Sequence, residues 1–463
     1  MKHRNRYEAK IRLRADHIPV EKPVGDIISQ RISTGINFDL YDKIHVEITA
    51  AVVYTPMKSF DEVDELKILR SNIRKLNWRK VTPVQKHSIP LILQGCDLMA
   101  CAQTGSGKTG AFILPVIAKM HENTNKNLKP KSLGQWPFEP EAVILAPTRE
   151  LAIQISGEAR VIAEGTSAKP CCLYGGTDTQ CLMKRLRSEF FNMLIATPGR
   201  LVDFIKRGFI ELRSECQYII LDEADRMLQM GFKKDIDFIA ENAKPIYSTK
   251  GSGFEQPPGE RQTLMFSATF PKPVQKLAHT FLRINHPFIA VGMVGSANRD
   301  ICQTVKQVDS QWKKDYLLEI LNKDLSNNPP ILTPKGEIHE KKTLVFVETA
   351  TKVVNVHQFL EYANLPVACM HGRISQSKRE EILEKFKSGS CPILIATAIA
   401  ARGLDIVGVD HILSEAQQEV PDFLESLVLH IGDTGIGKNG SQSLIWDLPL
   451  IHFKKHLMQY EWD

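Results

Sequence analysis

Short apolar runs alternate with longer helix-like stretches along most of the chain from Phe60 onward. "DLMACA" leads into "TGAFILPVIAKM", "AVILAPT" into "ELAIQISGEARVIA" and "NMLIATPG" into "RLVDFIKR", and "YIILDEAD" and "TLMFSATF" come later. Nearly continuous apolar strands followed by helices are typical of a parallel sheet that is covered on both faces. The pattern therefore predicts an α/β fold.

A second series of strands and helices begins near residue 304 and contains "TLVFVET", "VACMHG", "PILIATA", "DHIL" and "SLIWD". Between the two series, "VGMVGSANRDI" contains glycine and has little pattern, which suits an interdomain linker. Residues 1–57 are polar and lack sustained periodicity, so we expect a flexible extension there. The remaining boundaries are a first domain over 58–290, a linker over 291–303 and a second domain over 304–463, divergent from about 411.

The composition narrows the class of protein only slightly. Of 463 residues, 43% are hydrophobic and 24% are charged, which is the balance of a soluble globular protein. No apolar run has the length of a membrane span, and the first 30 residues lack the apolar region of a secretory signal. Nine cysteines without a CxxC pair indicate a reducing compartment rather than a disulfide framework or zinc site. The net charge of +6 permits a polyanionic partner without requiring one.

The strongest chemical motif is "AQTGSGKT" at residues 102–109, between a predicted strand and a predicted helix. Gly105 and Gly107 allow backbone N–H groups to wrap a phosphate, Lys108 can reach the β/γ-phosphates, and the Thr109 hydroxyl can contact Mg²⁺. Ala102 stands where the usual pattern has glycine. A plain strand-to-helix turn is the alternative, and the Gly-Lys-Thr sequence at this junction favours a phosphate loop.

A pair of carboxylates, Asp222 and Glu223, ends a second apolar strand. A carboxylate at this point can hold Mg²⁺ through water, and its neighbour can orient an attacking water. Two acids at a strand end are by themselves more often a helix cap or a solvated edge. The phosphate loop upstream favours the nucleotide interpretation.

These motifs and several others resemble those of DEAD-box RNA helicases, from Phe60 to about Leu413. The letters "DEAD" stand at 222–225 and "SAT" at 267–269, "TPVQ" ends at Gln85, and "APTREL", "GG" and "TPGR" follow in the first domain. "LVFVET", "MHGRISQSKRE" and "ATAIAARGLD" match the later motifs of the family. "GINFDLYDKIHVEI", "DLMACAQTGSGKT" and the closing "EWD" are most similar to the Vasa branch.

The resemblance implies two tandem RecA-like domains that bind ATP, Mg²⁺ and RNA in the cleft between them. The implied catalytic residues are Lys108, Asp222 and Glu223. Thr109 and Asp222 would hold Mg²⁺, largely through water. Ser267 and Thr269 would couple nucleotide binding to RNA binding. The implied nucleotide-binding residues are Phe60, Gln85, Gln103, Thr104, Gly105, Ser106, Gly107, Lys108, Thr109, Gly403 and Asp405. The implied RNA-binding residues are Pro147, Thr148, Arg149, Gly176, Thr197, Pro198, Gly199, Arg200, Thr349, Gln376, Arg379 and Thr397.

The chemistry of the RNA-binding set agrees with its implied role. Arginines, threonine hydroxyls and glycine N–H groups at strand ends suit phosphate and 2′-OH recognition, which needs no base sequence. For any one of these residues, a helix N-cap or a surface ion pair is an equally good interpretation.

The final motif of the family, His-Arg-Ile-Gly-Arg-Thr-Gly-Arg, is only partly present at residues 429–436. Ile431, Gly432, Thr434 and Gly435 match. The departures fall where the family has histidine or arginine, and these positions hold Leu429, His430, Asp433 and Ile436. The last two arginines would contact the γ-phosphate, and arginine fingers of this kind contribute about 10³–10⁵ in rate. A splicing change across 405–447 would give the same departure.

Two functions therefore compete. One is an RNA-stimulated ATPase that unwinds short duplexes, and the other is an ATP-binding RNA clamp or scaffold with impaired hydrolysis. A DNA translocase fits the "DEAD" and "SAT" letters less well. We expect a monomer in the cytoplasm or the nucleus, with no membrane contact. The Vasa resemblance adds perinuclear or germ granules and ribonucleoprotein partners.

Overall fold

The computed structural model describes residues 23–29, 44–50, 52–103, 105–126, 137–244, 260–292, 302–327, 331–332, 338–339, 342–397, 409–416 and 441–446. The chain divides into two compact units, Met1–Gly295 and Ser296–Asp463. This division falls inside the segment 291–303 that the sequence predicts as a linker. Each unit is an α/β domain with a largely parallel sheet, so the predicted fold class is confirmed.

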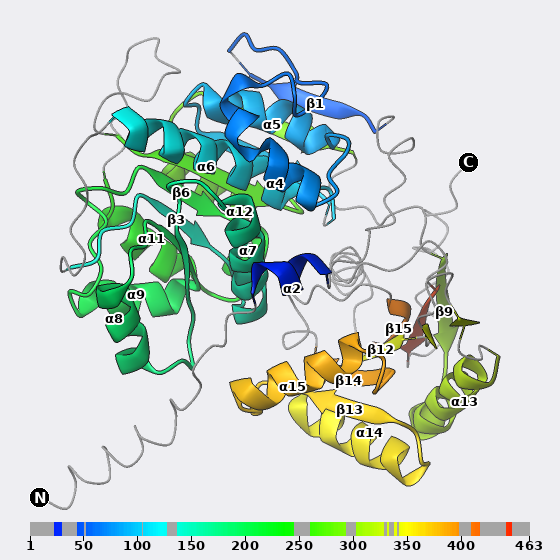
Figure 1. The fold of residues 1–463 in the computed structure, drawn as a ribbon. Coiled ribbons are helices and arrows are strands. Elements are labelled where there is room, and N and C mark those ends of the chain that lie inside the picture. Colours follow the sequence, from blue (N-terminus) through cyan, green and yellow to red (C-terminus); the bar gives the residue numbers. More distant parts are fainter. Residues whose placement is uncertain are drawn as a thin grey trace, which may run out of the picture. The chain divides into compact units, whose positions relative to one another are not determined.

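The sheet of the first unit has eight strands in the order β1-β8-β2-β7-β6-β3-β5-β4. Figure 1 labels β1, β3 and β6 of this sheet among the helices that cover it. Every neighbouring pair is parallel except β1 with β8. All residues of β2, β3, β5, β6 and β7 are buried, as their nearly continuous apolar sequences predict. In this sheet order the strands are Val46–Thr49, Phe288–Val291, Leu98–Ala102, Gln262–Ser267, Tyr218–Leu221, Ala142–Leu145, Met193–Ala196 and Pro170–Leu173.

Helices cover both faces of this sheet. Alternate residues of β3 belong to different apolar cores: Ile144 faces one core and Val143 the other. The 3-10 helix η1 (Asp64–Leu69) and helices α4 (Arg70–Lys75), α5 (Pro83–Leu93), α6 (Lys108–Lys126) and α7 (Arg149–Ile162) line the first core. Helices α8 (Thr179–Ser188), α9 (Pro198–Lys206), α10 (Ala224–Gln229), α11 (Lys233–Glu241) and α12 (Lys272–Phe281) line the second core.

Two parts of the segment predicted as an extension, 1–57, belong to the first unit instead. Strand β1 pairs antiparallel with β8, so that Val46 lies opposite Val291. Helix α2 (Val24–Ser29) packs on α7, and Ile27 joins the first apolar core. The pairing joins segments more than 200 residues apart, which no local pattern in the sequence could predict.

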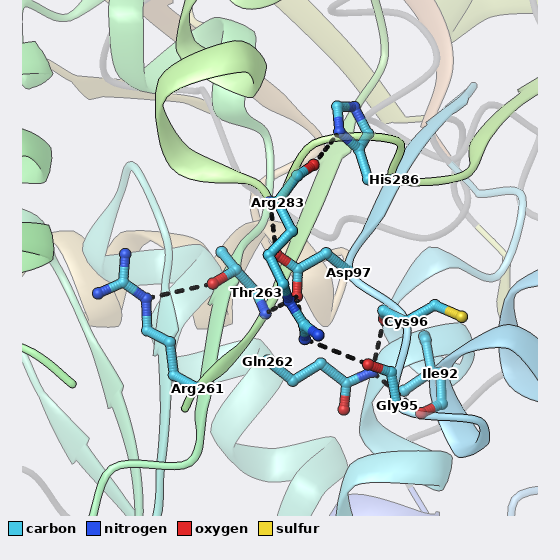
Figure 2. A network of polar contacts seen from close by, with 9 residues as sticks. All are labelled: Ile92, Gly95, Cys96, Asp97, Arg261, Gln262, Thr263, Arg283 and His286. Atoms are coloured by element: carbon cyan, nitrogen blue, oxygen red, sulfur yellow. Dashed lines mark hydrogen bonds and ion pairs between the residues drawn. The ribbon is translucent and has the colours of Figure 1, made fainter. Parts of the chain in front are cut away.

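A polar network joins the beginnings of β2 and β7, at the edge of the sheet opposite the motifs; we call it the strand-start clamp (Figure 2). Asp97 Oδ1 accepts hydrogen bonds from the Thr263 backbone N–H at 2.8 Å and from Arg283 Nη2 at 2.7 Å. The Gln262 side-chain amide donates to the carbonyls of Ile92 at 3.0 Å and Cys96 at 2.6 Å. Because Asp97 and Arg283 are 1% and 11% exposed, this is a buried ion pair with nearly complete hydrogen bonding.

The second unit has a sheet of six strands, all parallel, in the order β13-β14-β12-β15-β16-β9. In this order the strands are Val367–Met370, Ile393–Thr397, Lys342–Val347, Val409–Ala416, Ser441–Trp446 and Cys302–Gln307. Helix α15 (Gln376–Lys387) lines one apolar core, and α13 (Lys313–Asn327) and α14 (Ala350–Tyr362) line another. A short 3-10 helix η2 (Ser310–Trp312) precedes α13, and β10 (Ile331–Leu332) pairs with β11 (Ile338–His339).

Among the helices that the structure describes, none has both the length and the apolar character to cross a membrane.

Candidate functional site

Six sequence motifs of the first unit follow the carboxyl ends of parallel strands, whereas Phe60 and the "TPVQ" motif at the start of α5 do not. The phosphate loop follows β2, the Ser-Ala-Thr motif β7 and the carboxylate pair β6, and these three strands are neighbours. The motifs predicted to contact RNA follow β3, β5 and β4, the next three strands of the sheet. Ligands of open α/β sheets bind beyond the carboxyl ends of the strands. One sheet edge thus carries both sets of residues side by side.

The phosphate loop has the backbone that phosphate binding requires. Gly105 and Gly107 have φ values of 77° and 87°, a conformation that other residues rarely adopt. Lys108 is 7% exposed, and its ammonium donates to the Ala102 carbonyl at 2.7 Å. The Ser106 hydroxyl is buried and has no hydrogen-bond partner among the described residues. A phosphate would satisfy that hydroxyl, so the loop fits the ATP that the resemblance implies; Thr104 lies outside the described residues.

Gln85 is buried against the phosphate loop. Its Oε1 accepts from the Thr82 backbone N–H at 3.0 Å, and its Nε2 donates to the Gly107 carbonyl at 3.1 Å. A Cβ at Gly107 would lie 2.7 Å from Gln85 Nε2. Gln85 therefore joins the first turn of α5 to the loop, in addition to its predicted role in reading adenine.

Phe60 lies in the first apolar core and is 6% exposed. Its ring is stacked on that of Trp78, with the centroids 6.5 Å apart and the planes 27° apart. Trp78 in turn lies against Gly110 in the first turns of α6, where a Cβ would be 2.7 Å from the indole. Phe60 thus contacts the loop region through Trp78, and its adenine stacking stays a prediction.

Three buried carboxylates stand at the end of β6. Asp222 is 3% exposed, and burial raises its pKa to about 7, with the charge of Glu223 adding to the rise and Lys108 opposing it. Glu223 has φ 55° and ψ 51°, the left-handed conformation that is uncommon for residues other than glycine. Its Oε2 accepts from Arg226 Nη1 at 2.7 Å. Strained backbone of this kind is concentrated at functional sites.

The Ser-Ala-Thr motif is joined directly to the third of these carboxylates. Thr269 donates to Asp225 Oδ2 from its backbone N–H at 3.0 Å and from its hydroxyl at 2.7 Å. The Ser267 hydroxyl is fully buried and has no hydrogen-bond partner within the described ranges. The Thr269 bonds thus join the segments that follow β6 and β7, and the coupling role of Ser267 and Thr269 stays a prediction.

The RNA-binding candidates of the first unit gather around the beginnings of α7 and α9. Thr148 caps α7 and accepts from the Leu151 N–H at 3.3 Å, so the helix-cap interpretation holds for this residue. The Arg149 guanidinium lies on the glycine pair after β4, where a Cβ at Gly176 would be 2.8 Å from it. Thr197 is the N-cap of α9, whose first residues are Pro198, Gly199 and Arg200.

Arg200 is held by the loop that precedes α8 and by the first residue of that helix. Its Nη2 donates to the Thr177 carbonyl at 2.9 Å and to the Thr179 hydroxyl at 3.0 Å, and its guanidinium lies over the Phe204 ring. These contacts fix the arginine beside the amino ends of two helices, which attract anions. Pro147, between β3 and α7, is buried in the same region.

In the second unit, the candidates also follow neighbouring strands β12, β13 and β14. Thr349 caps α14 and accepts from the Lys352 N–H at 3.2 Å. The buried Gln376 donates to Glu380 Oε1 at 3.1 Å, Arg379 lies on the same helix, and Thr397 ends β14. Gly403, Asp405 and the segment 429–436 lie outside the described residues.

The sequence prediction does not include Arg226 and Trp78, among other residues of this site. Arg226 contacts Glu223, and Trp78 lies between Phe60 and Gly110 in the first turn of α6. The three-residue spacing from Glu223 to Arg226 could have indicated an ion pair, but acid–base pairs at this spacing are common on helices and do not identify a site.

We expect a pH-dependent contribution of His87 to the stability of the first unit. Tyr54 Oη lies 2.8 Å from His87 Nδ1, and burial and the nearby Lys86 lower the pKa of His87. In the unfolded chain His87 has its ordinary pKa of about 6.5, whereas its pKa in the folded protein is lower. The free energy of unfolding therefore falls as the pH drops below about 6.5. Urea unfolding at pH 7.5 and 5.5 should show a smaller loss for His87→Gln than for the wild type. Equal losses would contradict the assignment.

Comparison with known proteins identifies the family. The model of the DEAD/DEAH box helicase family matches residues 82–277, and that of the helicase conserved C-terminal domain matches residues 312–426. The chain belongs to the DEAD/DEAH box helicase family. The membership predicted from the sequence is therefore confirmed, and both matches fall in the units that carry the motifs.

This DEAD-box chain is similar in sequence to several DDX4 proteins. It is 42% identical over 423 residues to the probable ATP-dependent RNA helicase DDX4 of Pelophylax lessonae, and over 424 residues to that of Homo sapiens. It is also 42% identical over 410 residues to the ATP-dependent RNA helicase DDX4 of Mus musculus. These alignments cover 89–91% of this chain and 54% of each relative. The chain thus spans about half the length of the curated relatives it matches.

Solved structures confirm the RecA-like architecture of this DEAD-box chain. Mss116p bound to ssRNA and AMP-PNP has a TM-score of 0.67 at 27% identity, with 85% of this chain and 77% of that chain covered. A single-substitution variant of S. cerevisiae Dbp5 bound to RNA and ADP BeF3 has a TM-score of 0.65 at 22% identity, covering 87% and 91% of the two chains. The Dbp5 likeness shows the fold alone.

Proposed function

We propose that this chain is an ATP-dependent RNA helicase whose hydrolysis is slowed by its altered final motif. The observation that carries the proposal is the order of motifs along one sheet edge. The phosphate loop, the Ser-Ala-Thr motif and the carboxylate pair follow three adjacent strands, and the arginine and threonine set follows the next three. The Thr269–Asp225 contact lies within the first group, between the ends of β7 and β6.

Each group has a distinct task in this proposal. The loop N–H groups and Lys108 hold the phosphates of ATP, and Thr109 and Asp222 hold Mg²⁺, largely through water. Bound Mg²⁺ would neutralise phosphate charge. Glu223 orients the water that attacks the terminal phosphate. Arg149 and Arg200, beside two helix amino ends, bind the RNA backbone without reading its sequence.

A second candidate is an RNA clamp that binds ATP without significant turnover. Asp433 and Ile436 favour it, because they stand where the family has two arginines that contact the γ-phosphate. A carboxylate near this phosphate would repel it. The match to the helicase C-terminal domain ends at residue 426, before this segment. Sequencing the transcript across residues 405–447 would distinguish a genuine segment from a splicing change.

RNA-stimulated ATP hydrolysis separates the two candidates. We expect low turnover in the wild type, above the background of Glu223→Gln, and a rise of at least about tenfold in the double variant Asp433→Arg/Ile436→Arg. Wild-type turnover at the Glu223→Gln background, with nucleotide and RNA binding intact, would establish the clamp. High wild-type turnover that the double variant does not change would refute the effect of the final motif.

The cellular context stays a prediction from the composition and, for the granules, from the Vasa resemblance. It comprises a monomeric protein in the cytoplasm, with perinuclear or germ granules and ribonucleoprotein partners, or in the nucleus.

A further inference from the structure

The residue that follows the "DEAD" letters, Arg226, contacts two of the acids before it. Its Nη1 donates to Glu223 Oε2 at 2.7 Å, and its backbone N–H donates to Asp225 Oδ1 at 3.0 Å. The side chains of Arg226 and Glu223 are 7% and 9% exposed. Solvent therefore screens this ion pair little, in contrast to pairs on the surface.

The carboxylates of Asp222, Glu223 and Asp225 accept hydrogen bonds from different donors. Asp222 Oδ1 accepts from the Glu223 backbone N–H at 3.0 Å, and Asp225 Oδ2 accepts both bonds from Thr269. Arg226 contacts Glu223 through one oxygen, Oε2. Holding the carboxylate by Oε2 makes Oε1 the oxygen that would meet a water.

The backbone gives the Glu223 side chain an unusual starting direction. Its left-handed conformation comes between the end of β6 and the beginning of α10, and it costs about 1–2 kcal/mol for a residue with a Cβ. A glutamate has several rotatable bonds beyond that point, so backbone geometry alone does not fix its carboxylate. The guanidinium three residues later supplies a fixed partner within the buried site.

We propose that Arg226 is a positioning residue that holds the Glu223 carboxylate in the orientation needed to activate the attacking water. This inference rests on the proposed ATPase function and adds a residue to which the proposed mechanism gives no role. An arginine suits the task because its planar guanidinium is charged at all relevant pH values and binds in a defined direction. A misplacement of about 1 Å near the reacting atoms costs roughly 100-fold in rate.

Steady-state kinetics of Arg226→Gln and Arg226→Lys test the inference. We expect kcat for RNA-stimulated ATP hydrolysis to fall about 10–100-fold in Arg226→Gln. We expect KM for ATP and the Kd of a fluorescent ADP analogue to change by less than about threefold, because the phosphate loop is untouched. Arg226→Lys should recover part of kcat, since it restores the charge without the planar geometry.

Arg283→Gln is the matched control. It breaks another buried ion pair of the same unit, at the opposite edge of the sheet, and should lower stability while leaving kcat near the wild-type value below the unfolding transition. An equal loss of kcat in Arg283→Gln, a Kd that rises as much as kcat falls, or an unchanged kcat in Arg226→Gln would each overturn the positioning role. No turnover in either the wild type or the Asp433→Arg/Ile436→Arg double variant would instead refute the proposed function itself.

Discussion

Replacing Gly107 with alanine is expected to weaken ATP binding by at least about 100-fold. The residue has φ 87°, which costs about 1–2 kcal/mol for alanine. The new Cβ would also lie 2.7 Å from Gln85 Nε2 and 2.9 Å from Thr82 Oγ1, closer than van der Waals contact allows. The Gln85 amide is held by hydrogen bonds to the Thr82 N–H and the Gly107 carbonyl, so relief requires either breaking these bonds or moving the loop. Either change would disturb the arrangement of the loop N–H groups around a phosphate. Titration with a fluorescent ATP analogue measures the loss.

Gly105→Ala is the matched control for this substitution. Gly105 has a similar φ of 77°, but among the described residues no atom beyond its chain neighbours lies within 4 Å of the position that its Cβ would take. Backbone strain without a collision should therefore weaken binding by only about tenfold, following about 1.4 kcal/mol per factor of ten. If both variants bind equally weakly, contact with the α5 amino end does not fix the phosphate loop.

Asp97→Ala is expected to destabilise the first unit by about 3–5 kcal/mol. The substitution leaves Arg283 as a buried charge without its carboxylate, and it removes the acceptor of the Thr263 N–H. Such a loss corresponds to a fall of roughly 6–20 °C in the midpoint of the unit's thermal transition. Differential scanning calorimetry and urea unfolding measure it.

The surface pair between Lys75 and Glu164 provides the comparison for Asp97. These side chains are 43% and 47% exposed at an N–O distance of 2.6 Å, so Glu164→Gln should cost less than about 1 kcal/mol. A similarly small effect of Asp97→Ala would mean that water or another donor replaces the carboxylate, and the strand-start clamp would then contribute little to stability.

The strands and the residues at their carboxyl ends could be predicted because their signals are local. The phosphate loop and the carboxylate pair each follow an apolar run, and parallel strands bring their carboxyl ends to one edge whatever the detailed packing. The order of the strands was not predictable in the same way. It determines that the Ser-Ala-Thr motif lies between the phosphate loop and the carboxylates.

Contacts between distant segments could not be predicted from the sequence. Nothing local to Asp97 indicates that Arg283, 186 residues later, is its partner. Strand β1 lies in the polar segment 1–57 and has only four residues, which are alternately half-buried and exposed. A strand this short does not show its two-residue hydrophobic period clearly in the sequence. The hydrogen bond from Gln85 to the Gly107 carbonyl likewise joins residues 22 positions apart, and it forms because α5 packs on α6.

The pairing of β1 with β8 has a consequence for how the first unit can be rearranged. The chain enters the sheet at Val46 and leaves it at Val291, and these two residues are cross-strand partners. Chain ends that lie close together are the geometry that tolerates circular permutation and insertion into other proteins. The unit could therefore be closed by a short linker from 292 to 44 and reopened at the exposed turn after α7, Glu164–Gly165, with its sheet edge and its motifs unchanged.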